Sequence, residues 1–273
     1  MSSPPDAGAS PPPLPRTGER TLPDVPGESY WFARHVAAYD LATRKAGGRT
    51  VLDAGCGEGY GAAAMADTGA DRVVAVDLEP GVIEHIERAY PQVEPIRAEL
   101  TDLPLPDGAF DLITSFQVIE HVWDVPAYLA SLRRVLAPGG ELLLATPNRL
   151  TFTPDSPTPV NPFHVREFDP GELQHELTGA GFRVGAMLGL HHGRRLAAIE
   201  RVYGARDGVP GRSLQHRLGA SPPEGWPMGL RALVHRVRPS WFVLRADAIE
   251  ASLDLIAICR RADAWADDLD GPP

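Results

Sequence analysis

Cysteine is scarce in this chain. Only Cys56 and Cys259 occur among 273 residues, and they lie far apart. A secreted domain held together by disulfides would need more of them, so the two thiols predict a reducing compartment. No window of about 18 apolar residues occurs, and the N-terminus has neither the basic start nor the apolar core of a signal peptide. We therefore expect a cytoplasmic protein without a membrane span.

Positively charged side chains are also fewer than negatively charged ones. The chain has 26 Lys and Arg against 36 Asp and Glu, a formal net charge of -10, and the cations are scattered. Proteins that bind a phosphate backbone carry clustered cations, because neutralised phosphates supply much of the affinity. The charge balance therefore argues against nucleic acid as a partner.

The composition divides the chain into a domain and two tails. Residues 1–27 are rich in Pro, Ser and Gly, which predicts a disordered tail, and residues 263–273 predict a flexible one. Between them, over 28–262, short apolar strands alternate with helices, which indicates an α/β fold with a doubly wound parallel sheet. The segment 193–250 interrupts this pattern before a last apolar strand at 253–260. Its length predicts an inserted cap over an acceptor site.

A glycine-rich loop follows the first strand. In "VLDAGCGEGYG" the glycines occupy alternate positions, at Gly55, Gly57, Gly59 and Gly61. This spacing departs from the dinucleotide pattern G-x-G-x-x-G, which weakens an assignment to NAD. Asp53 would repel a pyrophosphate but suits the ammonium of S-adenosylmethionine (SAM), whose carboxylate can accept hydrogen bonds from glycine N–H groups. The loop therefore favours SAM as the cofactor.

The next two strands end in residues that suit the adenosine part of SAM. Asp77 ends "VVAVD", where a carboxylate can accept hydrogen bonds from both ribose hydroxyls. That residue fits SAM and NAD equally. Leu78 follows it, and Glu99 and Leu100 follow the third strand, where an adenine edge would reach. We expect these four residues to bind the cofactor together with the glycine loop.

Four motifs resemble the class I SAM-dependent methyltransferases, in the group that includes the UbiG-like enzymes. They are "VLDAGCGEGYG", "VVAVD", "LPLPDGAFDLITSFQVIEHVWD" and "LRRVLAPGGELLLATPN", in the order and spacing of that family. The resemblance implies a seven-stranded Rossmann-like sheet of strand order 3-2-1-4-5-7-6 with the last strand antiparallel. It also implies that the domain at 28–262 is a methyltransferase domain.

Other segments resemble the mycobacterial sugar O-methyltransferases associated with methylglucose lipopolysaccharide synthesis. They are "GERTLPDVPGESYWFARH", "FQVIEHVWD", "TPNRLTFTPDSPTPVNPFHVREF" and "SLDLIAI". This resemblance implies methyl transfer to a hydroxyl of a glucose-containing oligosaccharide or glycolipid precursor. The alternatives are O-methylation of a small molecule, such as a quinol, a phenol or a natural product, and a SAM-binding protein without turnover. A homo-oligomer is left open.

The segment "SFQVIEHVWD", after the fourth strand, carries candidate catalytic residues. A sugar hydroxyl is a poor nucleophile near neutral pH, so a base must remove its proton or a metal must polarise its oxygen. His121 is the candidate base, Glu120 and His121 are candidate Mg²⁺ ligands, and Gln117 is a candidate cofactor contact. UbiG-like enzymes have an acid where this chain has Gln117, which puts the metal in doubt because Mg²⁺ prefers oxygen ligands. Alternatively, Glu120 and His121 only hold the loop in place.

A second candidate cluster, "VNPFHVREF", follows the fifth strand. His164 is its candidate catalytic residue, as a second base or as a contact to the acceptor. The alternative is that this Pro-rich loop carries solvated polar side chains without a catalytic role.

Overall fold

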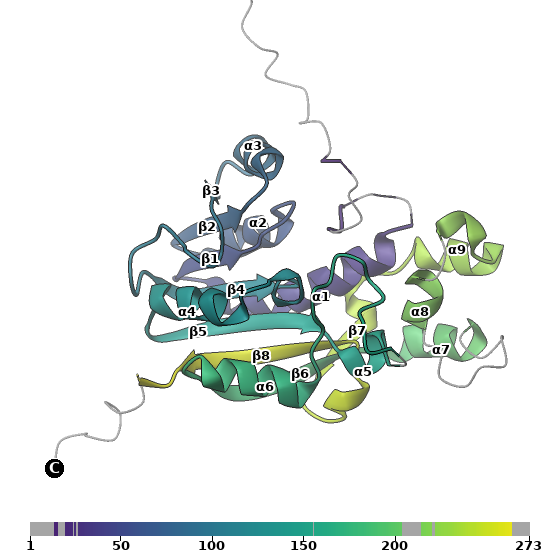
Figure 1. Ribbon diagram of the computed structural model, residues 1–273. Coiled ribbons are helices and arrows are strands. Elements are labelled where there is room, and N and C mark those ends of the chain that lie inside the picture. Colours follow the sequence, from purple (N-terminus) through teal and green to yellow (C-terminus); the bar gives the residue numbers. More distant parts are fainter. Residues whose placement is uncertain are drawn as a thin grey trace, which may run out of the picture.

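The computed structural model describes residues 14–15, 20–23, 25, 27–154, 156–203, 214–219 and 222–263. In these residues the strands form one eight-stranded sheet of order β3-β2-β1-β4-β5-β8-β6-β7, with helices packed on both faces (Figure 1). The strands are β1 (Thr50–Ala54), β2 (Arg72–Asp77), β3 (Glu94–Arg97), β4 (Phe110–Phe116), β5 (Leu136–Pro147), β6 (Phe182–His192), β7 (Phe242–Arg245) and β8 (Asp254–Arg261). The helices are α1 (Ser29–Ala46), α2 (Tyr60–Asp67), α3 (Pro80–Ala89), α4 (Val125–Val135), α5 (Arg149–Phe152), α6 (Pro170–Gly179), α7 (Arg194–Tyr203), α8 (Leu214–Gly219) and α9 (Met228–Val234).

The first five strands run parallel, as their continuous apolar sequences predict. In β1, every residue from Val51 to Ala54 is buried, because both faces of the strand are covered. Successive side chains point to opposite faces, so Val51 belongs to the core cluster that includes residues of α1 and α2. Leu52 belongs to the cluster that includes residues of α4 and α6. The parallel arrangement places the carboxyl ends of these strands along one edge of the sheet.

The prediction of seven strands is wrong by one strand. β8 lies antiparallel between β5 and β6, as expected for the last strand, but β7 adds an eighth strand beyond β6. β6 extends to His192, and the four residues of β7 pair with its last part through Leu190↔Leu244 and His191↔Val243. A strand this short has too few residues for a recognisable alternation of apolar and polar side chains, and it lies inside the segment predicted as the cap.

The segment 193–250 packs on the same core as the sheet. Leu196 of α7, Leu214 of α8 and Leu230 of α9 are buried, and they belong to the cluster that contains Val51. Figure 1 shows α7, α8 and α9 gathered at one end of the molecule, beyond β7. Within this segment, residues 204–213 and 220–221 lie outside the described residues.

The predicted tails fall mostly outside the described residues. Of the C-terminal tail only Asp263 is described, and of residues 1–27 the described ones include 20–23. In that short stretch Leu22 is buried against the main core. Among the described helices, none has the length and apolarity that crossing a bilayer requires.

Candidate active site

The carboxyl edge of the parallel strands gathers the residues singled out in the sequence. The glycine loop follows β1, Asp77 ends β2, and Gln117 to His121 follow β4. The loop that carries His164 follows β5 and α5. Ligands of open α/β sheets bind at this edge, because the loops diverge there from the neighbouring strands.

The glycine loop has a backbone that requires glycine and leaves space above it. Gly55, Gly57 and Gly59 have φ values of 81°, 55° and 97°, which side chains rarely adopt. A Cβ atom on Gly55 would lie 2.4 Å from a methyl group of Val118, whereas one on Gly57 would meet no atom within 4 Å. The backbone N–H of Gly57 donates to Asp77 Oδ2 at 3.1 Å. The loop is therefore open at Gly57, where a ligand can approach the backbone closely.

The residues assigned to adenosine lie at the ends of β2 and β3. Asp77 Oδ1 accepts from the N–H of Glu79 at 3.0 Å, so backbone donors hold the carboxylate in place. Leu78 is 55% exposed, Glu99 is exposed, and Leu100 is half-buried. An apolar side chain left exposed beside a fixed carboxylate fits the base and the ribose of a nucleoside. Their contacts with the cofactor stay predictions.

Asp53 lies beneath the glycine loop in a buried cluster. Its carboxylate accepts from Tyr39 Oη at 3.1 and 3.2 Å and from Thr114 Oγ1 at 2.7 Å. Burial raises the pKa of Asp53 to about 6, although these two hydrogen bonds lower it. The donors of α1 and β4 therefore occupy the carboxylate that the sequence assigned to the SAM ammonium, and that assignment stays a prediction.

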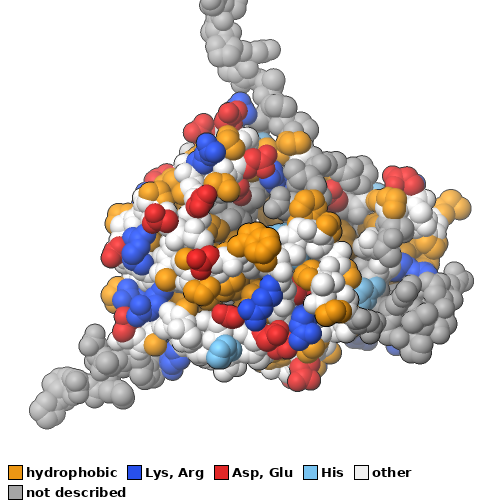
Figure 2. Space-filling view, viewed as in Figure 1, with side chains coloured by type: hydrophobic (Ala, Val, Ile, Leu, Met, Phe, Trp, Pro, Cys, Tyr) orange, Lys and Arg blue, Asp and Glu red, His pale blue; other side chains and the backbone are white. Residues whose placement is uncertain are grey.

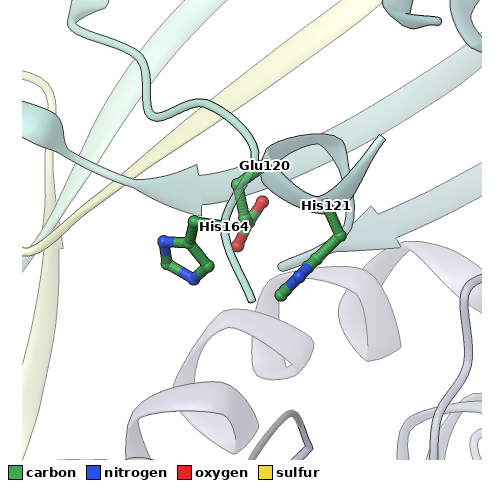
Figure 3. A group of neighbouring side chains, drawn as sticks. All are labelled: Glu120, His121 and His164. Atoms are coloured by element: carbon green, nitrogen blue, oxygen red, sulfur yellow. The ribbon is translucent and has the colours of Figure 1, made fainter. Parts of the chain in front are cut away.

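Glu120, His121 and His164 come together at the carboxyl edge, as Figure 3 shows. Glu120 and His121 belong to a single 3-10 turn (Ile119–His121) after β4, and His164 approaches from the loop after α5. One ligand atom from each residue lies within 4.8 Å of the other two, and the two imidazole centroids are 5.0 Å apart. The two histidines, 43 positions apart in the chain, therefore form one cluster.

The hydrogen bonds around the two imidazoles define how each ring is held. His164 Nδ1 lies 2.8 Å from Glu167 Oε1, and its Nε2 lies 3.0 Å from Asn161 Nδ2. The N–H of Phe163 donates to Asn161 Oδ1 at 3.0 Å, which orients the amide so that Nδ2 donates to His164. His121 Nδ1 lies 2.9 Å from the carbonyl oxygen of Phe163. A carbonyl only accepts, so this contact places the proton on Nδ1 and leaves Nε2 as the basic nitrogen of neutral His121.

Glu120 is fully buried beside these rings. Thr146 Oγ1 donates to its Oε2 at 2.9 Å, while Oε1 is buried and has no hydrogen-bond partner in the described structure. Burial raises the pKa of Glu120 to about 8. A buried carboxylate oxygen without a partner is costly unless a proton or a cation meets it. Near neutral pH Glu120 therefore keeps its proton unless a cation or an imidazolium meets Oε1.

Gln117 is turned away from this cluster, into a buried ionic network. Its Nε2 donates to Asp254 Oδ1 at 3.1 Å. Arg34 binds both oxygens of Asp254 at 2.6 Å and also donates to Gln215 Oε1 at 3.0 Å. A glutamate at 117 would place a second carboxylate against Asp254, so the amide suits this position. The predicted contact of Gln117 with the cofactor stays a prediction.

Aromatic side chains continue from the histidines toward α1. The ring of Phe152 lies 5.5 Å from that of His164, and the ring of Trp31 lies 6.4 Å from that of Phe152. On the outer side, Trp123 is 87% exposed and Phe163 is 41% exposed. In the view of Figure 2, hydrophobic side chains gather near the middle of the face, with charged groups around them. The polar cluster is therefore bordered by apolar surface.

Several residues of the site escaped the sequence reasoning. Asp53 accepts hydrogen bonds from Tyr39 and Thr114, and Glu120 accepts one from Thr146. Gln117 donates to Asp254, which Arg34 also binds. One local signal was available, because Asp254 is an acid at the start of an apolar strand that is otherwise buried. The other partners come from helices and strands far along the chain and leave no local pattern.

A doubly wound sheet, an open glycine loop after β1 and a carboxylate fixed at the end of β2 are typical of a site for a nucleoside-containing cofactor. Residues 52–144 match the family model described as a methyltransferase domain. The chain is 43% identical over 256 residues to a probable SAM-dependent methyltransferase of Mycolicibacterium smegmatis, covering 93% of this chain and 97% of that protein. It therefore belongs to the class I SAM-dependent methyltransferases, and SAM is its cofactor.

Two further comparisons extend this result. A ubiquinone biosynthesis O-methyltransferase of Xanthomonas oryzae pv. oryzae is 36% identical over 124 residues, which covers 41% of this chain and 47% of that protein. The crystal structure of a SAM-dependent methyltransferase from Mesorhizobium loti superposes with a TM-score of 0.52 at 19% identity, covering 82% of this chain and 98% of that one. The second comparison supports the fold alone.

Proposed function

We propose that this methyltransferase acts on a hydroxyl of a glucose-containing oligosaccharide or glycolipid precursor. The observation that carries the proposal is the cluster of Glu120, His121 and His164 at the carboxyl edge of β4 and β5. A hydroxyl acceptor needs a base or a Lewis acid, whereas SAM supplies an already activated methyl group. The ubiquinone biosynthesis relative is likewise an O-methyltransferase by name.

In this proposal His121 is the general base. The carbonyl of Phe163 holds its Nδ1–H, so Nε2 can take the proton of the acceptor hydroxyl as the oxygen attacks the methyl carbon of SAM. Asn161 and Glu167 engage both nitrogens of His164, so His164 fixes the loop beside His121 and contacts the acceptor through the carbon edge of its ring. The unpartnered Oε1 of Glu120 can then accept from an imidazolium or bind a cation.

A divalent cation at the same three residues is the alternative route to an activated hydroxyl. One carboxylate and two imidazoles suit Mn²⁺, Fe²⁺ or Zn²⁺ better than Mg²⁺, which prefers oxygen ligands. Glu167 holds Nδ1 of His164, as a carboxylate commonly holds a ligating histidine. On this route Nε2 of His164 would exchange its hydrogen bond from Asn161 for the cation. The bound cation would supply a Lewis acid, and Gln117 would take no part in holding it because its amide binds Asp254.

The surroundings of the cluster favour a sugar with an apolar part. Trp31 and Phe152 are half-buried rings with the Arg34 guanidinium over both, and their remaining surface suits the C–H surface of a pyranose, close to polar groups that can bind its hydroxyls. The exposed Trp123 and Phe163 suit an apolar portion of a glycolipid precursor. The segment 193–250 is proposed as the cap of this acceptor site. A flat, wholly apolar surround would favour a quinol instead.

The test is transfer of labelled methyl from SAM to glucosides, methylglucosides and quinols, with EDTA and with added Mg²⁺, Mn²⁺ or Zn²⁺. We expect product on a glucoside. His121→Gln should lower kcat by about 10²- to 10⁴-fold while the affinity for S-adenosylhomocysteine is unchanged. His175→Gln, at an exposed histidine on α6, is the matched control. Loss of activity in EDTA and its return with one metal would assign the metal route.

Each adverse outcome identifies a different error. Product on quinols alone would overturn the sugar assignment. Full turnover in His121→Gln would overturn the base assignment. Absence of transfer to every acceptor class, with SAM bound, would support a SAM-binding protein without turnover.

A further inference from the structure

The described residues just before α1 lie across the glycine loop region. Thr21 Oγ1 lies 3.4 Å from Tyr60 Oη and 3.5 Å from His35 Nδ1, and Tyr60 is the first residue of α2 after the loop. Leu22 is 4% exposed, and its N–H donates to Glu28 Oε2 at 3.1 Å. The segment 20–23 is therefore attached to the domain at both the loop and α1.

The guanidinium of Arg20, in this segment, has only part of its hydrogen-bonding capacity satisfied by the described residues. Its Nη2 donates to Glu79 in an ion pair, and Glu79 follows Asp77 by two residues. Its Nη1 is buried and has no hydrogen-bond partner among the residues that the structure describes. Leaving a buried charged donor without an acceptor is costly. An acceptor group of a bound ligand at this position would remove that cost.

The guanidinium lies beside the glycine loop as well as beside the end of β2. Burial raises the pKa of the Cys56 thiol, and Arg20 lies close enough for its charge to oppose that effect. Burial lowers the pKa of His35 to about 4, so the neighbouring imidazole adds no positive charge near pH 7. Arg20 therefore brings a cation beside Glu79, two residues after Asp77, and within electrostatic reach of Cys56.

SAM has one anionic group, the carboxylate of its methionyl part. If Asp77 binds the ribose, the methionyl part extends from there over the glycine loop, toward Cys56 and Gly57. A guanidinium recognises a carboxylate by parallel charge-assisted hydrogen bonds, and Nη1 is available for one of them. We propose that Arg20 binds the carboxylate of the methionyl group of SAM. This residue precedes the stretch 52–144 that the methyltransferase family model matches.

The proposal rests on SAM binding and not on the identity of the acceptor. The competing interpretation is that Arg20 only fastens its segment to Glu79 and so covers the whole cofactor. The two interpretations predict different effects of removing Arg20. If Arg20 only fastens a covering segment, its loss should weaken binding of the adenosine part as much as binding of the methionyl part.

The experiment is calorimetric titration of full-length protein with S-adenosylhomocysteine and with 5′-methylthioadenosine, which lacks the amino-acid part. For Arg20→Met we expect the Kd of S-adenosylhomocysteine to rise by about 10- to 100-fold, as for loss of a charged hydrogen bond, and the Kd of methylthioadenosine to change by less than about twofold. Glu79→Gln breaks the ion pair but keeps the guanidinium, and should leave the ratio of the two Kd values unchanged. Arg72→Met, which removes an exposed arginine paired with Glu94, is the matched control.

Two results would overturn the proposal. One is equal weakening of both ligands by Arg20→Met, which would assign Arg20 to fastening the segment. The other is an unchanged Kd for S-adenosylhomocysteine in a variant whose thermal unfolding matches that of the wild type.

Discussion

Replacing Arg34 by Met tests the buried ionic network beneath the site. Arg34 and Asp254 are 3% and 1% exposed, and Arg34 Nε and Nη2 bind the two carboxylate oxygens of Asp254 at 2.6 Å each. Arg34 also donates to the carbonyl of Leu253 at 2.7 Å. Removing one partner of a buried pair leaves the other charge uncompensated, which typically costs about 3 to 5 kcal/mol. Because whole domains are stable by only about 5 to 15 kcal/mol, this is a large share of the total.

A double variant separates the destabilisation caused by an unpaired buried charge from that caused by lost packing. In Arg34→Met together with Asp254→Asn, the buried carboxylate is gone while the amide oxygen can still accept from Gln117. We expect the double variant to regain at least about 2 kcal/mol relative to Arg34→Met alone, as an interaction energy between groups in direct contact. Asp254→Asn alone should be destabilising, because Arg34 then lacks its counterion.

The assay is equilibrium unfolding in urea, followed by fluorescence of the tryptophans and by circular dichroism. A change in midpoint with an unchanged slope reports stability directly. The reasoning would be refuted if Arg34→Met cost less than about 1 kcal/mol, or if the losses of the two single variants simply added. Either result would mean that solvent or another group compensates Asp254.

Two further predictions concern the cofactor loop and the acid beneath it. Gly57→Ala should cost about 1 to 2 kcal/mol of stability from its positive φ and also weaken SAM binding at least tenfold in calorimetry. Gly69→Ala, whose φ is also positive (87° against 55°) and whose Cβ would be equally unobstructed, should cost stability alone. Asp53 keeps its proton longer in the folded state, with a pKa of about 6 against 3.8, so its contribution to stability is full below about pH 3.8 and is lost as pH rises through about 6. Between pH 4 and pH 7, the wild type should therefore lose about 2 kcal/mol of unfolding free energy in urea that Asp53→Asn does not lose. Parallel curves for the two proteins would contradict the raised pKa.

The sequence was most informative where the chemistry is local. The alternate glycines predict a loop that holds SAM, and their positive φ values and the open space at Gly57 agree with a backbone that a ligand approaches. The resemblance to class I methyltransferases implies the order of seven strands, including the antiparallel last strand, which is β8. It fails for β7, because four residues at an edge are ordered mainly by pairing with β6.

Partners distant in sequence were beyond prediction. Arg34 and Asp254 are separated by 220 positions, and nothing in either local sequence indicates the other. Asp53 illustrates the same limit. Its place at the end of β1 suggested a ligand contact, yet alternation along the strand puts its side chain on the face of Val51, where Tyr39 of α1 binds it.

His121 and His164 show where prediction from sequence ends and geometry becomes necessary. Both histidines follow parallel strands that pair in the sheet, with Phe116 opposite Ala145, so their approach was predictable from topology. Topology does not predict the catalytic roles of the two histidines, because these depend on which nitrogen of each ring carries the proton. The carbonyl of Phe163 leaves Nε2 of His121 basic, whereas Asn161 and Glu167 engage both nitrogens of His164. These contacts are tertiary and cannot be read from the sequence, which named His121 as the candidate base without them, and its role as the base stays a proposal.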